Sequence, residues 1–264
     1  MDRNMKNDTP KWALILGGST GLGLATAQKL AKHGYHLFIL HRDRRTDMVE
    51  IQESFKEIRS SGVELHAFNM DATNPSKIEE TLCKIAEILK GSKIKVLVHS
   101  IAKGNLKPMV SENEELNSSD FQLTVHAMGI SLYEWSKALL INTLFDDDSR
   151  IIAFTSEGSS KAWEGYAAVS AAKAALESIV RSMALEFATH GIKVNCIQAG
   201  VTDTKSFRMI PNSDTLKEQA IQRNPFSRLT TPADVANAVY LLTLDEAQWI
   251  SGTILKVDGG ESLR

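Results

Sequence analysis

Tyr166 and Lys173 are the two residues whose types and spacing best fit a chemical role, and they lie in an alanine-rich run. If this run is a helix, seven steps turn through about 700°, which is two turns less about 20°, so the phenol and the ammonium share a face. Helical Cβ atoms tilt toward the N-terminus, so the lysine leans back toward the tyrosine. A phenol beside a cation is expected to have a lowered pKa, which suits a general acid or an oxyanion donor. The same spacing also arises by chance, so the pair indicates a site only if other motifs in the chain support one.

A second chemical feature is the glycine-rich turn at residues 17–23, with the spacing G-x-x-x-G-x-G. It lies between an apolar run and a segment with helical spacing, where the amides of a helix N-terminus attract phosphate. The spacing differs from G-x-G-x-x-G, but both leave the helix N-terminus open. An ordinary flexible turn is the alternative. We expect a dinucleotide to contact Gly17, Ser19, Thr20, Gly21, Leu22 and Gly23.

The charged residues after the second apolar run bear on the choice of cofactor. Arg42 lies close to the end of that run, where an arginine suits the 2′-phosphate of NADP and a carboxylate suits the ribose of NAD. We therefore expect NADPH. NADH is the alternative, because a small shift of register would place Asp43 at the ribose. Asp71, after the third run, would accept from the adenine amino group or cap a following helix.

Strand and helix patterns alternate along the chain. The sequence predicts strands at residues 12–16, 36–40, 64–69, 94–99, 150–154, 193–197 and 253–257. It predicts helices at residues 24–33, 48–60, 75–89, 119–141, 166–190 and 232–242. This alternation indicates an α/β fold, a single doubly wound Rossmann-type domain over residues 11–264 with a parallel sheet of about seven strands. We expect residues 1–10 to be a loose tail and residues 202–227 to be a substrate lid or a small helical insertion.

Composition excludes several classes of protein. A net charge of −2 gives no reason to expect a nucleic-acid partner or an anionic membrane surface. The two cysteines, Cys83 and Cys196, form no metal-binding or disulfide pattern and favour a reducing compartment. We expect the polar N-terminus not to be a signal peptide, and no apolar run is long enough to span a bilayer. We expect a cytoplasmic protein without a metal site.

Taken together, these motifs resemble the short-chain dehydrogenase/reductase family over almost the whole chain. The glycine turn, Asp71, the Tyr166/Lys173 pair, the run 194–200 and the run 257–260 carry the resemblance. It implies a doubly wound fold, a nicotinamide cofactor and a homotetramer. It also implies that the cofactor contacts Lys173 and a further set of residues, namely Ala72, Ser100, Ile101, Ala102, Ala199, Gly200, Val201 and Thr204.

Departures from the common family pattern point to one branch. Most members have Tyr-x-x-x-Lys with a serine thirteen residues before the tyrosine. Here Lys173 and Ser156 keep those places, Val169 holds the tyrosine place, and Tyr166 lies three residues earlier. The runs 99–102 (His-Ser-Ile-Ala) and 199–200 (Ala-Gly) also depart from the common pattern. These changes are similar to those of the NADPH-dependent enoyl-[acyl-carrier-protein] reductases, which implies an acyl thioester substrate on an acyl carrier protein. Tyr133 also begins a Tyr-x-x-x-Lys pattern, but it lies in the helix after the fourth predicted strand, which does not lead directly into the run 194–200.

The displaced tyrosine fits reduction of an enoyl thioester. Hydride adds to C3, and the charge develops on the thioester oxygen two carbons away; three helical residues displace the phenol by about 4.5 Å. We infer that Tyr166 stabilises the enolate oxygen and that Lys173 binds the nicotinamide ribose and supplies positive charge. Ser156 would contact substrate, order water or cap a turn.

Other expectations concern the substrate side. Trp163 and Phe207 are expected to line an acyl pocket, with core packing as the alternative. His126 stands where the family has an asparagine and is expected to order the surroundings of Lys173 or pack in the interior. Five basic residues would suit an acidic carrier protein or simply be exposed: Lys205, Arg208, Lys217, Arg223 and Arg228. The alternative functions are reduction of another activated alkene or a carbonyl, and a non-catalytic dinucleotide sensor.

Overall fold

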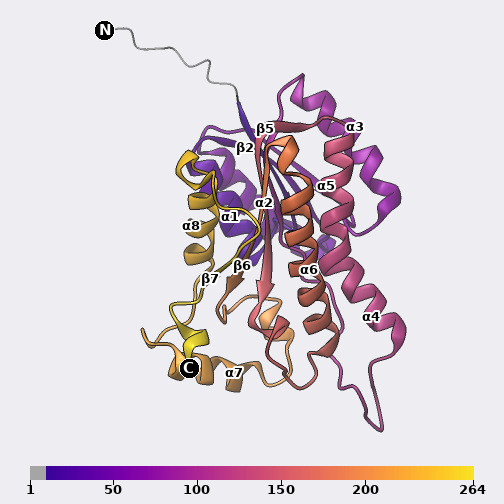
Figure 1. The fold of residues 1–264 in the computed structure, drawn as a ribbon, viewed down its shortest axis with the longest axis vertical. Coiled ribbons are helices and arrows are strands. Elements are labelled where there is room, and N and C mark those ends of the chain that lie inside the picture. Colours follow the sequence, from indigo (N-terminus) through magenta and orange to yellow (C-terminus); the bar gives the residue numbers. More distant parts are fainter. Residues whose placement is uncertain (1–9) are drawn as a thin grey trace.

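The computed structural model describes residues 10–264, so nearly all of the predicted tail lies outside the described residues. A seven-stranded parallel sheet forms the centre, with the strand order β3-β2-β1-β4-β5-β6-β7 (Figure 1). The strands are β1 Lys11–Leu16, β2 Tyr35–His41, β3 Leu65–Asn69, β4 Ile94–His99, β5 Phe145–Ser156, β6 Ile192–Ala199 and β7 Ile254–Val257. The predicted doubly wound α/β fold is confirmed.

Helices cover both faces of the sheet. They are α1 Gly21–Lys32, α2 Met48–Arg59, α3 Ile78–Leu89, α4 Ser118–Val125, α5 Ser131–Ile141, α6 Ala167–Glu186, α7 Ser213–Arg223 and α8 Pro232–Leu242. Side chains of α3, α5 and α6 pack on one face, and those of α1, α2 and α8 pack on the other. Figure 1 shows these two layers on either side of the strands.

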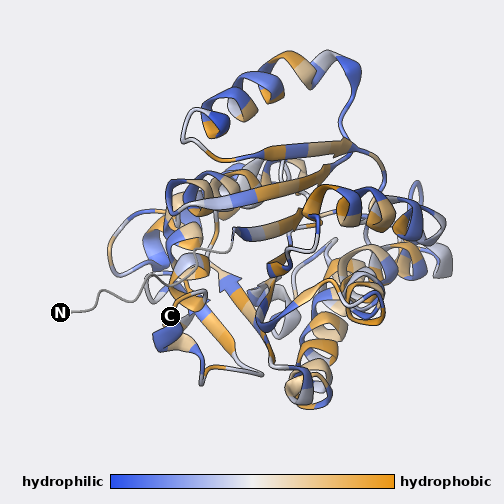
Figure 2. Cartoon of the chain, turned by 90° about the horizontal axis from the view of Figure 1, so that it is seen from above, coloured by the Kyte–Doolittle hydropathy of each residue, from blue (hydrophilic) through white to orange (hydrophobic). Residues whose placement is uncertain are grey.

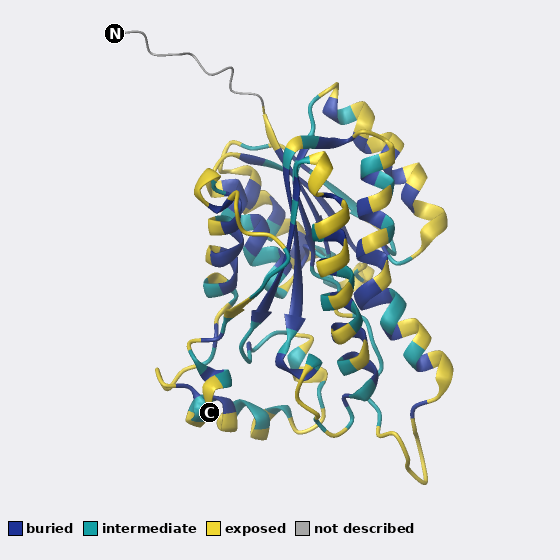
Figure 3. Ribbon diagram, in the orientation of Figure 1, coloured by how far each residue is buried: buried dark blue, intermediate teal, exposed yellow. Residues whose placement is uncertain are grey.

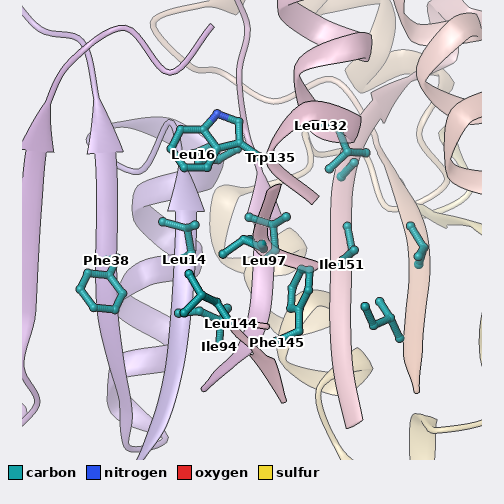
Figure 4. Packing of buried hydrophobic residues seen from close by; sticks show 14 of the residues in the cluster. Leu14, Leu16, Phe38, Ile94, Leu97, Leu132, Trp135, Leu144, Phe145 and Ile151 are labelled. Carbon is teal, nitrogen blue, oxygen red and sulfur yellow. The ribbon is translucent and has the colours of Figure 1, made fainter. Parts of the chain in front are cut away.

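The strands form because their aliphatic side chains are buried on both faces of a parallel sheet. Leu14, Leu97 and Ile151 lie on neighbouring strands in one core cluster, and Leu132 and Trp135 of α5 cover them (Figure 4). Figure 3 shows the strands buried and the outer helix surfaces exposed. Figure 2 shows the matching pattern of hydropathy, with hydrophobic strands and hydrophilic stretches on the helices.

Two predicted elements differ from the structure. The helix predicted at 119–141 is divided by a π-helical turn, His126–Ile130, which separates α4 from α5. Strand β5 begins at Phe145, before the predicted 150, because Phe145 pairs with Ile94 of β4. The register then shifts, and Arg150 pairs with Val96.

The segment at 202–227 contains a short turn of 3-10 helix, Phe207–Met209, and helix α7. It therefore has the form of a small helical insertion. In Figure 1 it lies at the end of the molecule to which the strands β5 and β6 point, beside the C-terminus. Ligands of open α/β sheets bind at this carboxyl end of the strands. Within residues 10–264, no helix is long and apolar enough to cross a membrane.

Candidate active site

Tyr166 and Ser156 meet at the carboxyl end of the sheet. Ser156 ends β5, and Tyr166 immediately precedes α6, where its carbonyl accepts a hydrogen bond from the Ser170 amide at 2.8 Å. The phenol oxygen lies 3.5 Å from Ser156 Oγ. The Tyr166 side chain is buried, and burial raises its pKa, although the Ser156 hydrogen bond opposes the increase. The phenol is therefore a neutral donor at physiological pH.

Lys173 lies in the same wall of the site but is held separately. Its buried Nζ donates to the Phe154 carbonyl at 2.8 Å. Burial lowers the pKa of Lys173 to about 8, against the opposing charges of Cys196 and Glu177. The prediction that the ammonium lowers the pKa of Tyr166 is wrong for this structure, because burial outweighs any such effect.

Three neighbours hold the tyrosine ring in place. A Cβ added at Gly158 would lie 2.6 Å from Tyr166 Cε1, so only glycine lets this backbone pass the ring. The Trp163 ring is tilted against it at a centroid distance of 5.1 Å. Ser170 Oγ donates to the Gly158 carbonyl, while the Gly158 amide donates to Ser156 Oγ at 3.2 Å. Ser156 therefore caps this turn as well as facing the phenol.

Sequence reasoning did not identify Gly158 or Ser170. The position of Ser170, four residues after Tyr166 and therefore on the same face of a helix, was the available signal.

The glycine turn brings two loops into close contact. Gly17 has φ +87°, and a Cβ there would lie 2.4 Å from the Ser100 carbonyl oxygen. A Cβ at Gly23 would lie 2.0 Å from the Gly17 carbonyl oxygen. These approaches leave room for no side chain, and they place the turn, the start of α1 and the segment after β4 around one space. A cradle of this kind fits the pyrophosphate of a dinucleotide.

A cavity of about 580 Å³ extends from this turn to Lys173. Most of the expected cofactor residues line it, namely Gly17, Ser19, Thr20, Gly21, Leu22, Arg42, Asp71, Ala72, Ser100, Ile101, Ala102, Lys173 and Thr204. Gly23 instead packs behind the turn, against Gly17. Ala199, Gly200 and Val201 line an adjoining cavity. We refer to these two spaces as the cofactor cavity and the substrate cavity.

Arg42 and Asp71 meet in the cofactor cavity. Arg42 Nη1 donates to Asp71 Oδ2 at 3.0 Å, and Lys103 Nζ donates to the same oxygen at 3.0 Å. Burial would raise the pKa of Asp71, but hydrogen bonds from Thr73 and Lys103 outweigh it and lower the pKa to about 2. Lys103 is a residue that the motifs did not indicate, although it directly follows Ala102.

Asp43 also lines the cofactor cavity, but it has a different partner. Its Oδ2 lies 2.8 Å from His41 Nδ1, and 13% of its side chain is exposed, compared with 64% of the Arg42 side chain. The carboxylate that would favour NAD is thus paired with a buried histidine, while the more exposed guanidinium is paired with Asp71.

The substrate cavity, about 360 Å³, shares Tyr166, Ser156 and Thr204 with the cofactor cavity. Trp163 and Phe207 line it, as does Val169, the residue in the family's tyrosine place. At the start of α6, the hydroxyl that faces the substrate cavity is therefore that of Tyr166 and not one at position 169.

Each of the five basic residues at 205–228 has a carboxylate partner. Lys205 pairs with Asp47 at 2.9 Å, and Arg208 and Lys217 both pair with Asp203, at 2.6 and 2.9 Å. The other two pairs are Arg223 with Glu157 and Glu261, and Arg228 with Asp234.

Tyr133 and His126 lie elsewhere. Tyr133 is partly exposed on α5, with the Lys137 ammonium 5.6 Å from its ring centroid, and among residues 10–264 it is not part of either cavity lining. His126 Nε2 lies 3.2 Å from Glu134 Oε1, so its ring is engaged within the α4–α5 segment. The described residues contain no cluster of three or more histidine, cysteine or acidic side chains that would hold a metal ion.

A Rossmann-type sheet, a glycine cradle, and a buried tyrosine and lysine beside Ser156 define a nicotinamide-dependent oxidoreductase. The family model described as "Enoyl-(Acyl carrier protein) reductase" matches residues 17–262, and the chain belongs to this family of short-chain dehydrogenase/reductases. The family binds NAD(P)H, and the chain is an oxidoreductase.

The known relatives act on varied substrates. The chain is 27% identical to 1-cyclohexenylcarbonyl-CoA reductase of Streptomyces collinus over 97% of this chain and 88% of that protein. It is 30% identical to 2,5-dichloro-2,5-cyclohexadiene-1,4-diol dehydrogenase of Sphingobium indicum, covering 96% of both. Among solved structures, enoyl-[acyl-carrier-protein] reductase (NADH) of Aquifex aeolicus superposes with a TM-score of 0.84 at 25% identity, covering 96% of this chain and 97% of that one.

Proposed function

We propose that this chain reduces the 2,3 double bond of an enoyl thioester with NADPH, as in fatty-acid biosynthesis. The observation that carries the proposal is the displaced phenol: Tyr166 lines both cavities, while Val169 presents an apolar side chain to the substrate cavity. A carbonyl substrate needs its acid beside the carbon that accepts hydride. An enoyl thioester needs it two carbons away, which the shift by one helical turn supplies.

The roles of the site residues follow from their contacts. A bound reduced nicotinamide supplies the hydride. The Tyr166 hydroxyl, whose contact with Ser156 is long at 3.5 Å, is free to donate to the thioester oxygen as negative charge develops there. Lys173 binds the nicotinamide ribose and adds positive charge. Ser156 caps the turn that packs Gly158 against the tyrosine ring, and the proton at C2 comes from solvent.

Two observations support NADPH over NADH. The Arg42 guanidinium is exposed to the cofactor cavity, where it would bind the 2′-phosphate. The Asp43 carboxylate, which would bind the ribose of NADH and repel that phosphate, is held by His41.

The carrier of the acyl group is part of the same proposal. An acyl carrier protein is acidic and would have to compete with the carboxylates that pair the basic residues at 205–228. A coenzyme A thioester needs no such docking surface, and the likeness to a cyclohexenylcarbonyl-CoA reductase makes a compact enoyl-CoA the second candidate substrate.

We also propose a homotetramer in the cytoplasm. Large apolar side chains are exposed on α5 and α6 (Ile141 and Leu185) and near β7 (Trp249), which suits contacts between copies of the chain. The free thiols of Cys83 and Cys196 suit a reducing compartment.

The test follows oxidation of NADPH and of NADH with crotonyl and acetoacetyl thioesters, each on coenzyme A and on acyl carrier protein. We expect NADPH oxidation with the crotonyl substrates and little with the acetoacetyl substrates. Oxidation with acetoacetyl but not crotonyl thioester would overturn the proposal. The ratio of kcat/KM on the two carriers decides between them, and the mass of the assembly in solution tests the tetramer.

A further inference from the structure

Part of the substrate cavity has a charged wall that a simple alkyl chain does not match. Arg223, the last residue of α7, donates from Nη2 to Glu261 Oε1 at 2.7 Å and from both Nη atoms to Glu157 Oε2 at 3.3 Å. All three residues line the cavity. None of them lines the cofactor cavity, so the charged wall belongs to the substrate cavity alone.

The two carboxylates of this wall are buried. Glu157 is 8% exposed and Glu261 is 3% exposed. Glu261 Oε2 also accepts from the Val201 amide at 3.0 Å, and burial raises the pKa of Glu261. Glu157 Oε1 accepts no hydrogen bond among the described residues, although Lys161 Nζ lies 2.5 Å away. The wall thus joins the turn after β5, the end of α7 and the C-terminal segment in one ion cluster.

The other walls are mainly apolar. They are formed by Leu106, Met128, Trp163, Val169, Phe207, Ile210 and Leu216. An acyl chain that lengthens along these walls binds more tightly with each methylene removed from water, until its end reaches the charged side chains of the wall. There an alkyl terminus would exclude the remaining water from ions without replacing its hydrogen bonds, which is unfavourable.

A neutral polar group would meet this wall better than either an alkyl or an anionic one. With Lys161 included, the cluster has two positive and two negative side chains, and the cavity lining adds the carboxylate of Asp258, so the wall has no excess positive charge to hold an anion. Gln219, one turn before Arg223 on α7, adds an amide to the lining. The cavity is also small, near the lower end of the usual range of about 300–1,000 Å³ for ligand pockets.

We infer that the Glu157–Arg223–Glu261 wall limits acyl length, and that the substrates are short acyl thioesters or ones with a neutral hydrogen-bonding group, such as a hydroxyl, at the distal end. This inference rests on the proposed enoyl thioester function and names the substrate class within it.

Binding tests the inference without turnover. N-acetylcysteamine thioesters of saturated acids from butanoate to dodecanoate, and of their ω-hydroxy analogues, are titrated calorimetrically into the enzyme with NADP⁺. We expect affinity to rise about fourfold per methylene, as burial of about 0.8 kcal/mol per CH₂ gives. At the length that reaches the wall, affinity should fall at least tenfold below this trend, and the ω-hydroxy ester of that length should recover it. An unbroken rise through dodecanoyl, or no benefit from the hydroxyl at any length, would overturn the inference.

Variants locate the effect. Arg223→Met combined with Glu157→Gln removes one charge of each sign, so the remaining Glu261 and Lys161 stay balanced. This double variant should lose the break in the length series and the preference for the hydroxyl; a break that persists would refute the role of this wall. Glu218→Gln, an exposed change on the same helix, should keep both. The wild-type series decides the question even if the double variant does not fold. An enzyme that shows the break but reduces no crotonyl thioester would refute the proposed reaction and leave the wall intact.

Discussion

Replacing Tyr166 with phenylalanine should separate catalysis from stability. The substitution removes one oxygen and keeps the ring that packs on Gly158 and Trp163. Among residues 10–264, that oxygen has only the 3.5 Å contact with Ser156, which is too long to contribute much. Because a typical buried hydrogen bond contributes about 1 kcal/mol, we expect a loss of stability below that value.

The catalytic loss should be much larger. A preorganised donor to a developing oxyanion contributes about 10²- to 10³-fold to kcat. In the proposed reaction Tyr166 supplies that donor, while Lys173 is held independently by the Phe154 carbonyl and should still bind cofactor. We therefore expect Tyr166→Phe to lower kcat on crotonyl thioester about 10²- to 10³-fold, with the dissociation constant of NADPH changed less than about threefold.

The assay combines steady-state kinetics, NADPH titration and thermal unfolding on the same preparations. Tyr133→Phe, at a partly exposed position on α5, is the matched control and should behave as wild type in all three. A Tyr166→Phe enzyme with more than a third of wild-type kcat would remove the phenol from the mechanism. A large loss of NADPH affinity would show that the phenol acts on the cofactor instead.

Three further predictions concern the cofactor cavity. Arg42→Met should raise KM for NADPH about 10- to 100-fold and that for NADH less than about threefold, because hydrogen bonds to charged groups contribute about 1.5–3 kcal/mol; equal changes would contradict the assignment. Lys173, with a pKa of about 8 before binding, is about one quarter protonated at pH 8.5, and nearby phosphate should raise that pKa. NADPH binding at pH 8.5 should therefore take up about 0.7 protons by calorimetry in two buffers, and Lys173→Met should abolish the uptake. Gly23→Ala places a Cβ 2.0 Å from the Gly17 carbonyl oxygen and should weaken NADPH binding at least about tenfold, whereas Gly34→Asn, where nothing lies within 4 Å, should not.

The parts of the fold that local patterns determine could be predicted from sequence. Aliphatic runs bounded by turns gave all seven strands, and their alternation with helices gave a parallel sheet. The π-helical turn at His126–Ile130 could not be predicted, since its residues keep the spacing of an ordinary helix. The early start of β5 was missed because the polar residues 146–150 separate Phe145, which pairs with β4, from the apolar run that follows.

The site shows the same division. The glycine turn and the neighbourhood of Tyr166 and Ser156 follow from motifs that lie on adjoining elements. In the wall formed by Glu157, Arg223 and Glu261, Arg223 is 66 positions from Glu157 and 38 from Glu261. No local sequence pattern predicts that these residues meet. The pKa of Tyr166 was misjudged for a similar reason, because burial depends on the whole fold around the ring and outweighs one charge seven residues away.

The fixed position of Lys173 gives the displacement of the tyrosine its meaning. Lys173 is tied to the Phe154 carbonyl and lines the cofactor cavity. In the proposed reaction it therefore sets where the nicotinamide ribose lies relative to α6. The hydride donor is then fixed with respect to the helix, and moving the hydroxyl from position 169 to Tyr166 moves it relative to the hydride. An acid that lies one turn away from the place used for carbonyls favours a substrate whose charge develops away from the carbon that accepts hydride. Val169 supports the same conclusion. It stands at the family's tyrosine place, and its apolar side chain cannot donate a proton to a carbonyl oxygen there. The selectivity that we propose, crotonyl over acetoacetyl thioester, therefore depends on two positions of one helix.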